Sequence, residues 1–142
     1  MHLKKKLWIF VTIILVIIIS IGTIELLSNP LRRPEEYIRG DVLKVIPVGT
    51  SMEDVILTVE NCEKWEIFGK IYEHIGVTTG SRGPSTGYPL ADEEVVGEKS
   101  MRIYVGQYLA YFFIETDVSF YIAFDKNSEL IDIFVEKSMN VL

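Results

Sequence analysis

The residues that could perform acid–base or metal chemistry are few in this sequence. His74 is the only histidine outside the N-terminal region, and Cys62 is the only cysteine. One histidine builds neither a Ser-His-Asp triad nor a multi-histidine metal site, and one cysteine gives neither an internal disulfide nor a thiolate zinc cluster. We therefore interpret His74 as a sheet-face side chain and Cys62 as a small hydrophobe at the end of an apolar helix face.

An acidic run offers a second possible site. Asp92, Glu93 and Glu94 supply oxygen atoms of the kind that calcium prefers. The alternating Asp or Asn positions and the glycine of a calcium loop are absent, so we interpret the run as solvated. The glycines between Thr78 and Gly97 lack the Lys-Ser/Thr and the helix of a phosphate loop. We predict no catalytic residue, no metal and no cofactor.

The aromatic residues are the better indication of function. Tyrosines at strand positions provide large contact areas at low entropic cost, as protein interfaces prefer. An equally weighted alternative is that such rings cover the second face of the sheet or pack under a long loop. The candidate interaction surface comprises Tyr72, His74, Tyr104, Tyr108 and Tyr121.

An apolar segment near the N-terminus indicates where the protein works. Leu7 to Ile24 is a run of eighteen uncharged residues. As a helix it spans ~27 Å, close to the ~30 Å hydrocarbon core of a bilayer. Lysines at positions 4–6 precede it, so the positive-inside rule places the N-terminus in the cytoplasm and the following domain outside. The sequence predicts a single-pass protein of the cell membrane.

A cleaved secretory signal is the competing interpretation. The stretch from Leu7 to Ile19 has the right size for the apolar h-region of a signal peptide, and Ser20-Ile21-Gly22 is a passable cleavage site. We favour an uncleaved anchor because the apolar run continues to Ile24. The predicted organisation is a lysine cluster and transmembrane anchor over residues 1–27, a linker over 28–33 and an exported domain over 34–142.

The exported domain is acidic. With the three N-terminal lysines and Glu25 set aside, 11 basic and 19 acidic side chains remain, a net charge of about −8. That charge argues against nucleic acid and anionic lipid as partners. It is usual for a solvated surface, although it would also attract a basic protein.

Two short helices are expected at the start of this domain. Apolar residues recur at helical spacing from Tyr37 to Ile46, and Pro47 ends that helix. Thr50 and Glu53 match a capping box, which predicts the start of a second helix. The short connection between them predicts an antiparallel helix pair.

The composition then becomes strand-like. Residues 65–77 are rich in aromatic and β-branched types, whereas residues 78–97 have the composition of a long loop. Strand character resumes over 100–108, and the alternation over 117–124 continues into a hairpin with 130–135. The fold class is therefore α+β, with an N-terminal transmembrane helix followed by a helix pair packed on an antiparallel sheet of about four strands (α-α-β-β-β-β).

A nine-residue stretch between the predicted helices, Pro47 to Val55, has the sequence PVGTSMEDV. This Gly-Thr-Ser turn ahead of a strand meander resembles the SmpA/OmlA (BamE) family and the wider group with the fold of β-lactamase inhibitory protein. The resemblance implies an exported, non-enzymatic binding or assembly protein. The lipobox cysteine of the BamE relatives and the Gly-x-Pro after their second helix are missing, so an outer-membrane assembly role is not implied. With its hydrophobic anchor, the chain resembles a small membrane-anchored protein of a Gram-positive bacterium more than it resembles the BamE lipoproteins.

The sequence therefore predicts a membrane-anchored, extracytoplasmic protein- or ligand-binding module without catalytic activity. Two alternatives stay open. One is an inhibitor or immunity-type protein that neutralises a toxin or enzyme, for which the acidic charge would be the active feature. The other is an accessory subunit of an envelope assembly or sensing complex.

Overall fold

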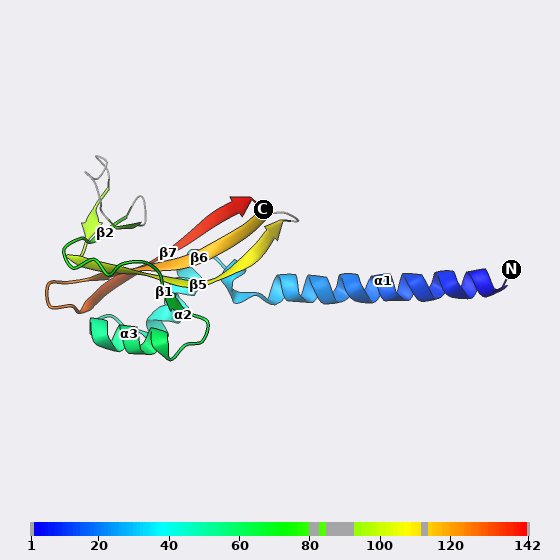
Figure 1. The fold of residues 1–142 in the computed structure, drawn as a ribbon, viewed down its shortest axis with the longest axis horizontal. Helices are drawn as coiled ribbons and strands as arrows, with labels where there is room; N and C mark the ends of the chain where they lie inside the picture. Colours follow the sequence, from blue (N-terminus) through cyan, green and yellow to red (C-terminus); the bar gives the residue numbers. More distant parts are fainter. Residues whose placement is uncertain (1, 80–82, 85–92, 112–113, 142) are drawn as a thin grey trace.

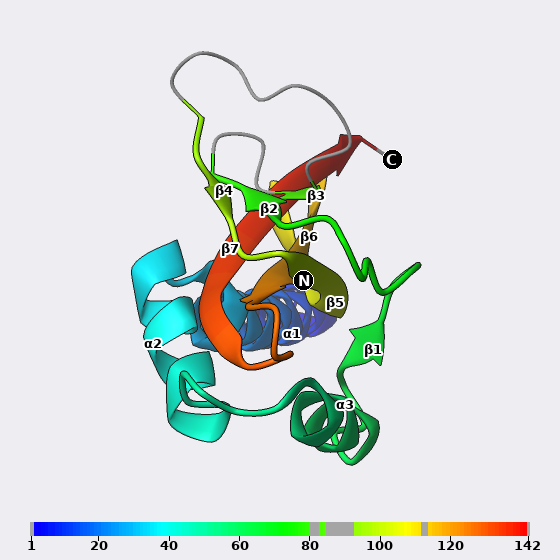
Figure 2. The same ribbon diagram turned by 90° about the vertical axis from the view of Figure 1, so that its left-hand side faces the viewer.

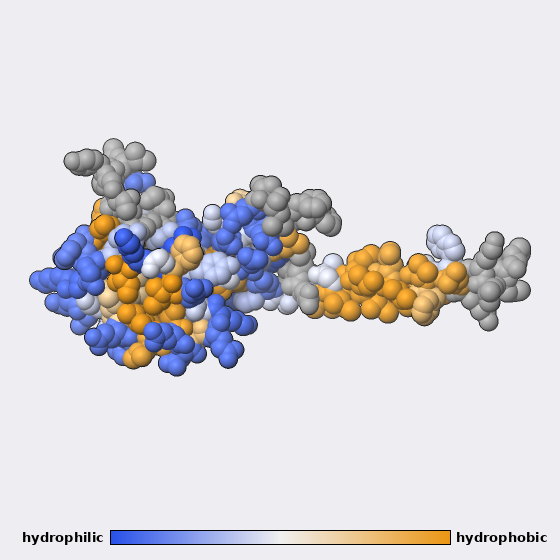
Figure 3. All heavy atoms as spheres, in the orientation of Figure 1, coloured by the Kyte–Doolittle hydropathy of each residue, from blue (hydrophilic) through white to orange (hydrophobic). Residues whose placement is uncertain are grey.

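A long N-terminal helix stands apart from the rest of the chain (Figure 1). The computed structural model describes residues 2–79, 83–84, 93–111 and 114–141. Helix α1 (His2–Ser28) contains the apolar run Leu7–Ile24, which has a mean hydropathy of 2.8 and is not buried by any other part of the protein. Hydrophobic side chains cover the visible face of this run (Figure 3). The helix is long and apolar enough to cross a membrane.

Three short helical elements follow: η1 (Pro30–Arg32), a 3-10 turn, then α2 (Glu35–Val45) and α3 (Met52–Glu60). Two acidic residues occupy the first turn of α2, where the positive end of the helix dipole favours negative charge. Each helix buries one apolar stripe at helical spacing. The buried residues are Ile38 and Val42 in α2, and Met52, Val55 and Val59 in α3.

Helix α3 begins one residue later than the sequence predicts. The Ser51 hydroxyl accepts a hydrogen bond from the Asp54 N–H at 3.1 Å and donates one to the Asp54 carboxylate at 2.8 Å. The carbonyl of Thr50 instead accepts from the Leu130 N–H at 2.9 Å, which holds Thr50 outside the helix. The capping box predicted at Thr50 and Glu53 is therefore wrong, because tertiary pairing fixes the backbone there and moves the cap to Ser51.

The main sheet has the strand order β1-β5-β6-β7, with every neighbouring pair antiparallel. Its strands are β1 (Glu66–Ile67), β5 (Lys99–Tyr111), β6 (Ile114–Phe124) and β7 (Leu130–Val141). The expected sheet of about four strands and the hairpin between the last two are confirmed. The apolar alternation in β6 also faces the core as predicted, with at most 2% of each side chain exposed at Val118, Phe120, Ile122 and Phe124.

The two helices lie on one side of this sheet but do not form an antiparallel pair. Figure 2 presents α2 lengthwise and α3 end-on, so their axes cross. Helix α2 packs against β7, and α3 packs against β1 at the opposite edge. The apolar stripe of each helix is thus buried against the sheet near a different edge strand, β7 for α2 and β1 for α3. The antiparallel helix pair predicted from the short connection is therefore wrong.

A second, three-stranded sheet lies across the other face of the main sheet (Figures 1 and 2). It contains β2 (Val77–Thr78), β3 (Gly83–Pro84) and β4 (Val95–Val96) in the order β3-β2-β4. The predicted loop over 78–97 therefore contributes strands where it is described, whereas residues 80–82 and 85–92, Asp92 among them, lie outside the described part.

Most of the segment 65–77 is not the strand that its composition predicts. Within it the structure has β1, an isolated bridge between Tyr72 and Ser100, and the first residue of β2. Gly69 adopts a φ of +84°, which breaks the extended path directly after β1. The aromatic and β-branched residues of this segment are used for packing around the sheet edge and do not form a continuous ladder.

A bulge in β5 changes which face its side chains occupy. The register with β6 shifts between Tyr104 and Gly106, and Gly106 has a φ of +132°. Before the bulge, Met101 and Ile103 face the helices; after it, Tyr108 lies opposite Thr116 on that same helix-side face. One extra residue therefore places Tyr104 and Tyr108 on opposite faces.

Gly76 and Gly97 allow the small sheet to approach β6. A Cβ atom on Gly76 would lie 2.2 Å from the Gly97 carbonyl oxygen, whereas one on Gly40, within α2, would meet no atom inside 4 Å. We expect Gly76→Ala to reduce the free energy of unfolding by about 1–3 kcal/mol through overpacking. Gly40→Ala should raise it by about 0.5–1 kcal/mol. Urea unfolding followed by tryptophan fluorescence measures both, and equal effects would contradict the close approach.

The shifted cap gives a second prediction. Ser51→Ala should lower the free energy of unfolding by about 1 kcal/mol, because the Asp54 N–H loses its acceptor. Thr50→Ala removes only a hydroxyl that donates to the Pro47 carbonyl, so its cost should be clearly smaller. Thermal unfolding of the two single variants compares them directly. A larger loss of stability in Thr50→Ala than in Ser51→Ala would indicate that Thr50 caps the helix, contrary to the structure.

Candidate binding site

The structure divides the predicted tyrosine surface between two faces of the main sheet. Tyr104 and Tyr121 lie on the face opposite the helices, and Tyr72 bridges to Ser100 at the edge of that face. Tyr108 lies on the helix side because of the bulge. His74 is exposed on the connection between β1 and β2, beside a separate hollow formed with Val95 and Glu98.

Tyr121 is not an exposed contact residue, because only 7% of it is accessible. It packs with Val77 and Ala123 beneath the small sheet. Of the two interpretations left open for the tyrosines, packing on a covered second face is the one that holds for Tyr121. Tyr72, Tyr104 and Tyr108 are half-buried.

A half-buried cation, Arg102, organises this second face. The Arg102 guanidinium lies 5.0 Å from the Phe68 ring centroid and 5.4 Å from the Tyr121 ring centroid. It also pairs with the Glu136 carboxylate at 3.5 Å. Sequence analysis missed Arg102, although it stands directly opposite Tyr121 in the β5–β6 register. We call these four residues the Arg102 cluster and interpret it as packing, since its rings already surround the charge.

The phenols of this face have raised pKa values. Burial is the main reason that the pKa of Tyr121 lies above its ordinary value of 10.0; Arg102 opposes the shift and Glu136 adds to it. Burial also raises the pKa of Tyr104, and the Asp117 and Glu115 carboxylates add to that effect. Both rings are therefore held as neutral phenols.

A large apolar hollow lies on the other face, between η1, α2 and β5. Two adjoining cavities of about 220 and about 550 Å³ share four lining residues: Pro30, Leu31, Trp65 and Val105. Trp65 forms one wall and packs edge-on against Phe120, with ring centroids 5.8 Å apart and planes at 90°. The wider of the two has a volume in the range of ordinary ligand sites, about 300–1,000 Å³. We call this hollow the helix-side groove.

The rim of the helix-side groove is charged. Arg33 forms a 2.6 Å ion pair with Asp41, and Lys64 lines the wider cavity. Hydrogen bonds from Lys44 and then Arg33 hold the pKa of the Asp41 carboxyl below its usual range. An apolar floor with charges of both signs at the rim is suited to a partner side chain that is apolar at its tip and polar at its base.

The segment predicted as a linker is part of this site. Leu31 packs against the core, the Arg32 guanidinium donates to the Leu109 carbonyl, and the Lys137 ammonium donates to the Arg33 carbonyl at 2.6 Å. Residues 30–33 are thus attached to both β5 and β7. The available signal was the single leucine among the polar and basic residues of this segment, since a free linker does not need a leucine packed against the core.

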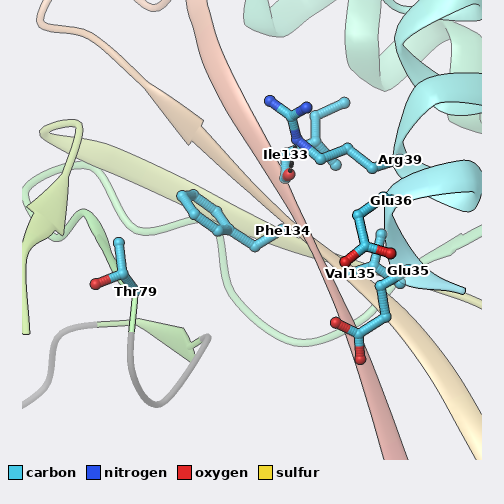
Figure 4. A pocket seen from close by; sticks show the side chains of 7 residues that line it. All are labelled: Glu35, Glu36, Arg39, Thr79, Ile133, Phe134 and Val135. Atoms are coloured by element: carbon cyan, nitrogen blue, oxygen red, sulfur yellow. Dashed lines mark hydrogen bonds between the residues drawn. The ribbon is translucent and has the colours of Figure 1, made fainter.

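A smaller hollow of about 220 Å³ straddles β7 (Figure 4). On one side Arg39 of α2 donates to the Ile133 carbonyl at 3.0 Å and to the Asp132 carboxylate at 3.1 Å. On the other side Phe134 points toward Thr79, which directly follows β2 (Figure 4). The Arg39 contacts attach α2 to the edge strand, so this hollow is explained as part of the packing.

No three His, Cys, Asp or Glu side chains converge as a metal site in the part of the chain that the structure describes. No protein-family model, curated protein or solved structure matches this chain. Within the described part of the chain, the helix-side groove is the apolar candidate site, and two half-buried tyrosines of the predicted surface, Tyr72 and Tyr104, belong to the opposite face.

The raised pKa of Tyr121 predicts an alkaline loss of stability. The folded state disfavours the phenolate form of Tyr121. The neutral phenol therefore contributes to the free energy of unfolding in full below pH 10, and this contribution is lost as pH rises through the pKa of the folded state. We expect the free energy of unfolding to fall less steeply above pH 10 in Tyr121→Phe than in the wild type, with Tyr104 accounting for part of the remaining slope. Urea titrations from pH 8 to 11 measure this; parallel profiles would contradict it.

Proposed function

We propose that this protein is a membrane-anchored, extracytoplasmic binding module without catalytic activity. The single observation that carries the proposal is the helix-side groove, an apolar hollow next to the end of the apolar helix α1. The N-terminal lysines favour a cytoplasmic N-terminus, which puts the groove on the outer side of the membrane.

The occupant that fits the groove best is a protein segment with one or two large apolar side chains. The floor consists of core residues such as Phe120 and Val105, so an inserted side chain would continue the hydrophobic core. The rim carries Arg33, Asp41 and Lys64, which can bind backbone or polar groups of a peptide. Since η1 follows α1 directly, an extracytoplasmic segment of a neighbouring membrane protein would reach the groove without crossing the domain.

The resemblance to exported binding and assembly domains of the SmpA/OmlA type supports the same class of function. Within that class, an accessory role in an envelope complex fits an apolar groove close to the membrane. Tyr72 and Tyr104 remain proposed contact residues on the opposite face, and the exposed His74 is a further proposed contact residue on the connection between β1 and β2.

Site-specific photocrosslinking of the full chain in its native membrane tests the groove. A benzoylphenylalanine at Lys64, inside the wider cavity, should give a discrete adduct. Val45→Asp should reduce that adduct at least ~10-fold, because a carboxylate at the groove would be desolvated without a partner. Leu57→Asp is the matched control, since Val45 and Leu57 are 60% and 54% exposed on helices but only Val45 lines the groove.

The two aspartate variants should be about equally stable, because surface substitutions usually change stability by ~0.5 kcal/mol or less. A Lys64 adduct that persists in Val45→Asp, or that disappears equally in Leu57→Asp, would contradict docking in the groove.

A further inference from the structure

The domain is acidic overall, yet one hollow at its α1 end is lined by two cations. A cavity of about 350 Å³ lies between η1 and the ends of β5 and β7, and its lining residues are Arg32, Tyr108, Ala110, Thr116, Lys137 and Met139. Figure 1 places the ends of β5 and β7 on the side of the domain from which α1 leaves. The helix-side groove shares none of these residues.

Both cations lie against one aromatic ring. The Arg32 guanidinium is 5.3 Å from the Tyr108 ring centroid, and the Lys137 ammonium is 5.4 Å from it. Each donates one hydrogen bond, to the carbonyls of Leu109 and Arg33 respectively, and so keeps further donors. Among the described residues neither cation pairs with a carboxylate. Two cations that line one hollow, without a carboxylate partner among the described residues, favour an anion in that hollow.

The third feature is a buried hydroxyl without a partner. Thr116 is 2% exposed, and its Oγ1 makes no hydrogen bond among the described residues. An unsatisfied buried hydroxyl is unfavourable in a folded protein and is therefore uncommon. Here it belongs to a residue that lines the same hollow as Arg32 and Lys137, so a bound acceptor oxygen that reaches Oγ1 would satisfy it.

We infer that Arg32, Lys137 and Thr116 form a phosphate-binding pocket at the membrane surface. The guanidinium fork and the ammonium supply the charge, and the hydroxyl supplies a neutral donor, as is usual at phosphate sites. Arg32 stands four positions after Ser28, the last residue of α1, which places the pocket near the level of lipid headgroups. The phosphate is that of a phospholipid headgroup or a free phosphate, and the experiment separates these sources.

Methionine methyl NMR of the full chain in dodecyl maltoside micelles, which contain no phosphate, provides the readout. Met139 lines the pocket, whereas Met52 and Met101 are buried in the core and report on folding. Inorganic phosphate, added at constant ionic strength against chloride, should shift the Met139 methyl signal saturably and leave the two core signals unchanged. A second titration uses phosphatidylglycerol mixed into the micelles.

Three variants and one control test the donors. Arg32→Gln and Lys137→Gln should each weaken binding at least ~10-fold, because a charge-assisted hydrogen bond is lost. Thr116→Val keeps the side-chain shape and should weaken binding ~5-fold or more without lowering the melting temperature, since the hydroxyl has no partner in the empty pocket. Lys126→Gln, on the turn at the far end of the sheet, should bind as the wild type does.

A response at lower concentration with phosphatidylglycerol than with phosphate identifies the lipid headgroup as the source, and the reverse order identifies free phosphate. The inference is overturned if neither ligand shifts Met139, if chloride shifts it equally, or if Thr116→Val binds as tightly as the wild type while Met52 and Met101 report an intact core.

Discussion

Strand β6 is buried on both faces, and the other elements of the domain are arranged to cover it. Toward the helices it presents Val118, Phe120, Ile122 and Phe124; toward the small sheet it presents Ser119, Tyr121 and Ala123. Each large apolar side chain that is fully buried contributes about 1.5–3 kcal/mol relative to exposure. Two layers of cover are needed, which explains why α2 and α3 cover one face of this strand while β2 and β4, distant in the chain, cover the other.

The turn between α1 and the domain separates two kinds of hollow. Leu31 faces the helix-side groove, whereas its neighbour Arg32 faces the cationic hollow beside Tyr108. Because η1 is tied to β5 and β7 by backbone carbonyls, both hollows keep a defined position relative to the end of α1. The attachment would hold a partner segment in the groove and a phosphate group in the hollow at the same level of the membrane.

Net charge was a poor guide to this part of the surface. The charge of about −8 was evidence against anionic partners when averaged over the domain that follows α1. The fold instead brings Arg32 and Lys137, 105 positions apart, to one tyrosine ring and leaves them without carboxylates among the described residues. Local charge depends on which strands end side by side, and composition contains no information on that point.

The sequence by itself determined the features that depend on local pattern. The apolar run of α1, the helical stripes of α2 and α3, and the alternation in β6 were predicted because each pattern repeats over neighbouring residues. Tertiary structure decided where long-range pairing overrides local preference. Pairing with Leu130 moved the cap of α3 from Thr50 to Ser51, the bulge at Gly106 moved Tyr108 to the other face, and the small sheet buried Tyr121. The groove and the phosphate pocket belong to this second class, because their lining residues come from elements far apart in the chain and meet only after the sheet has formed.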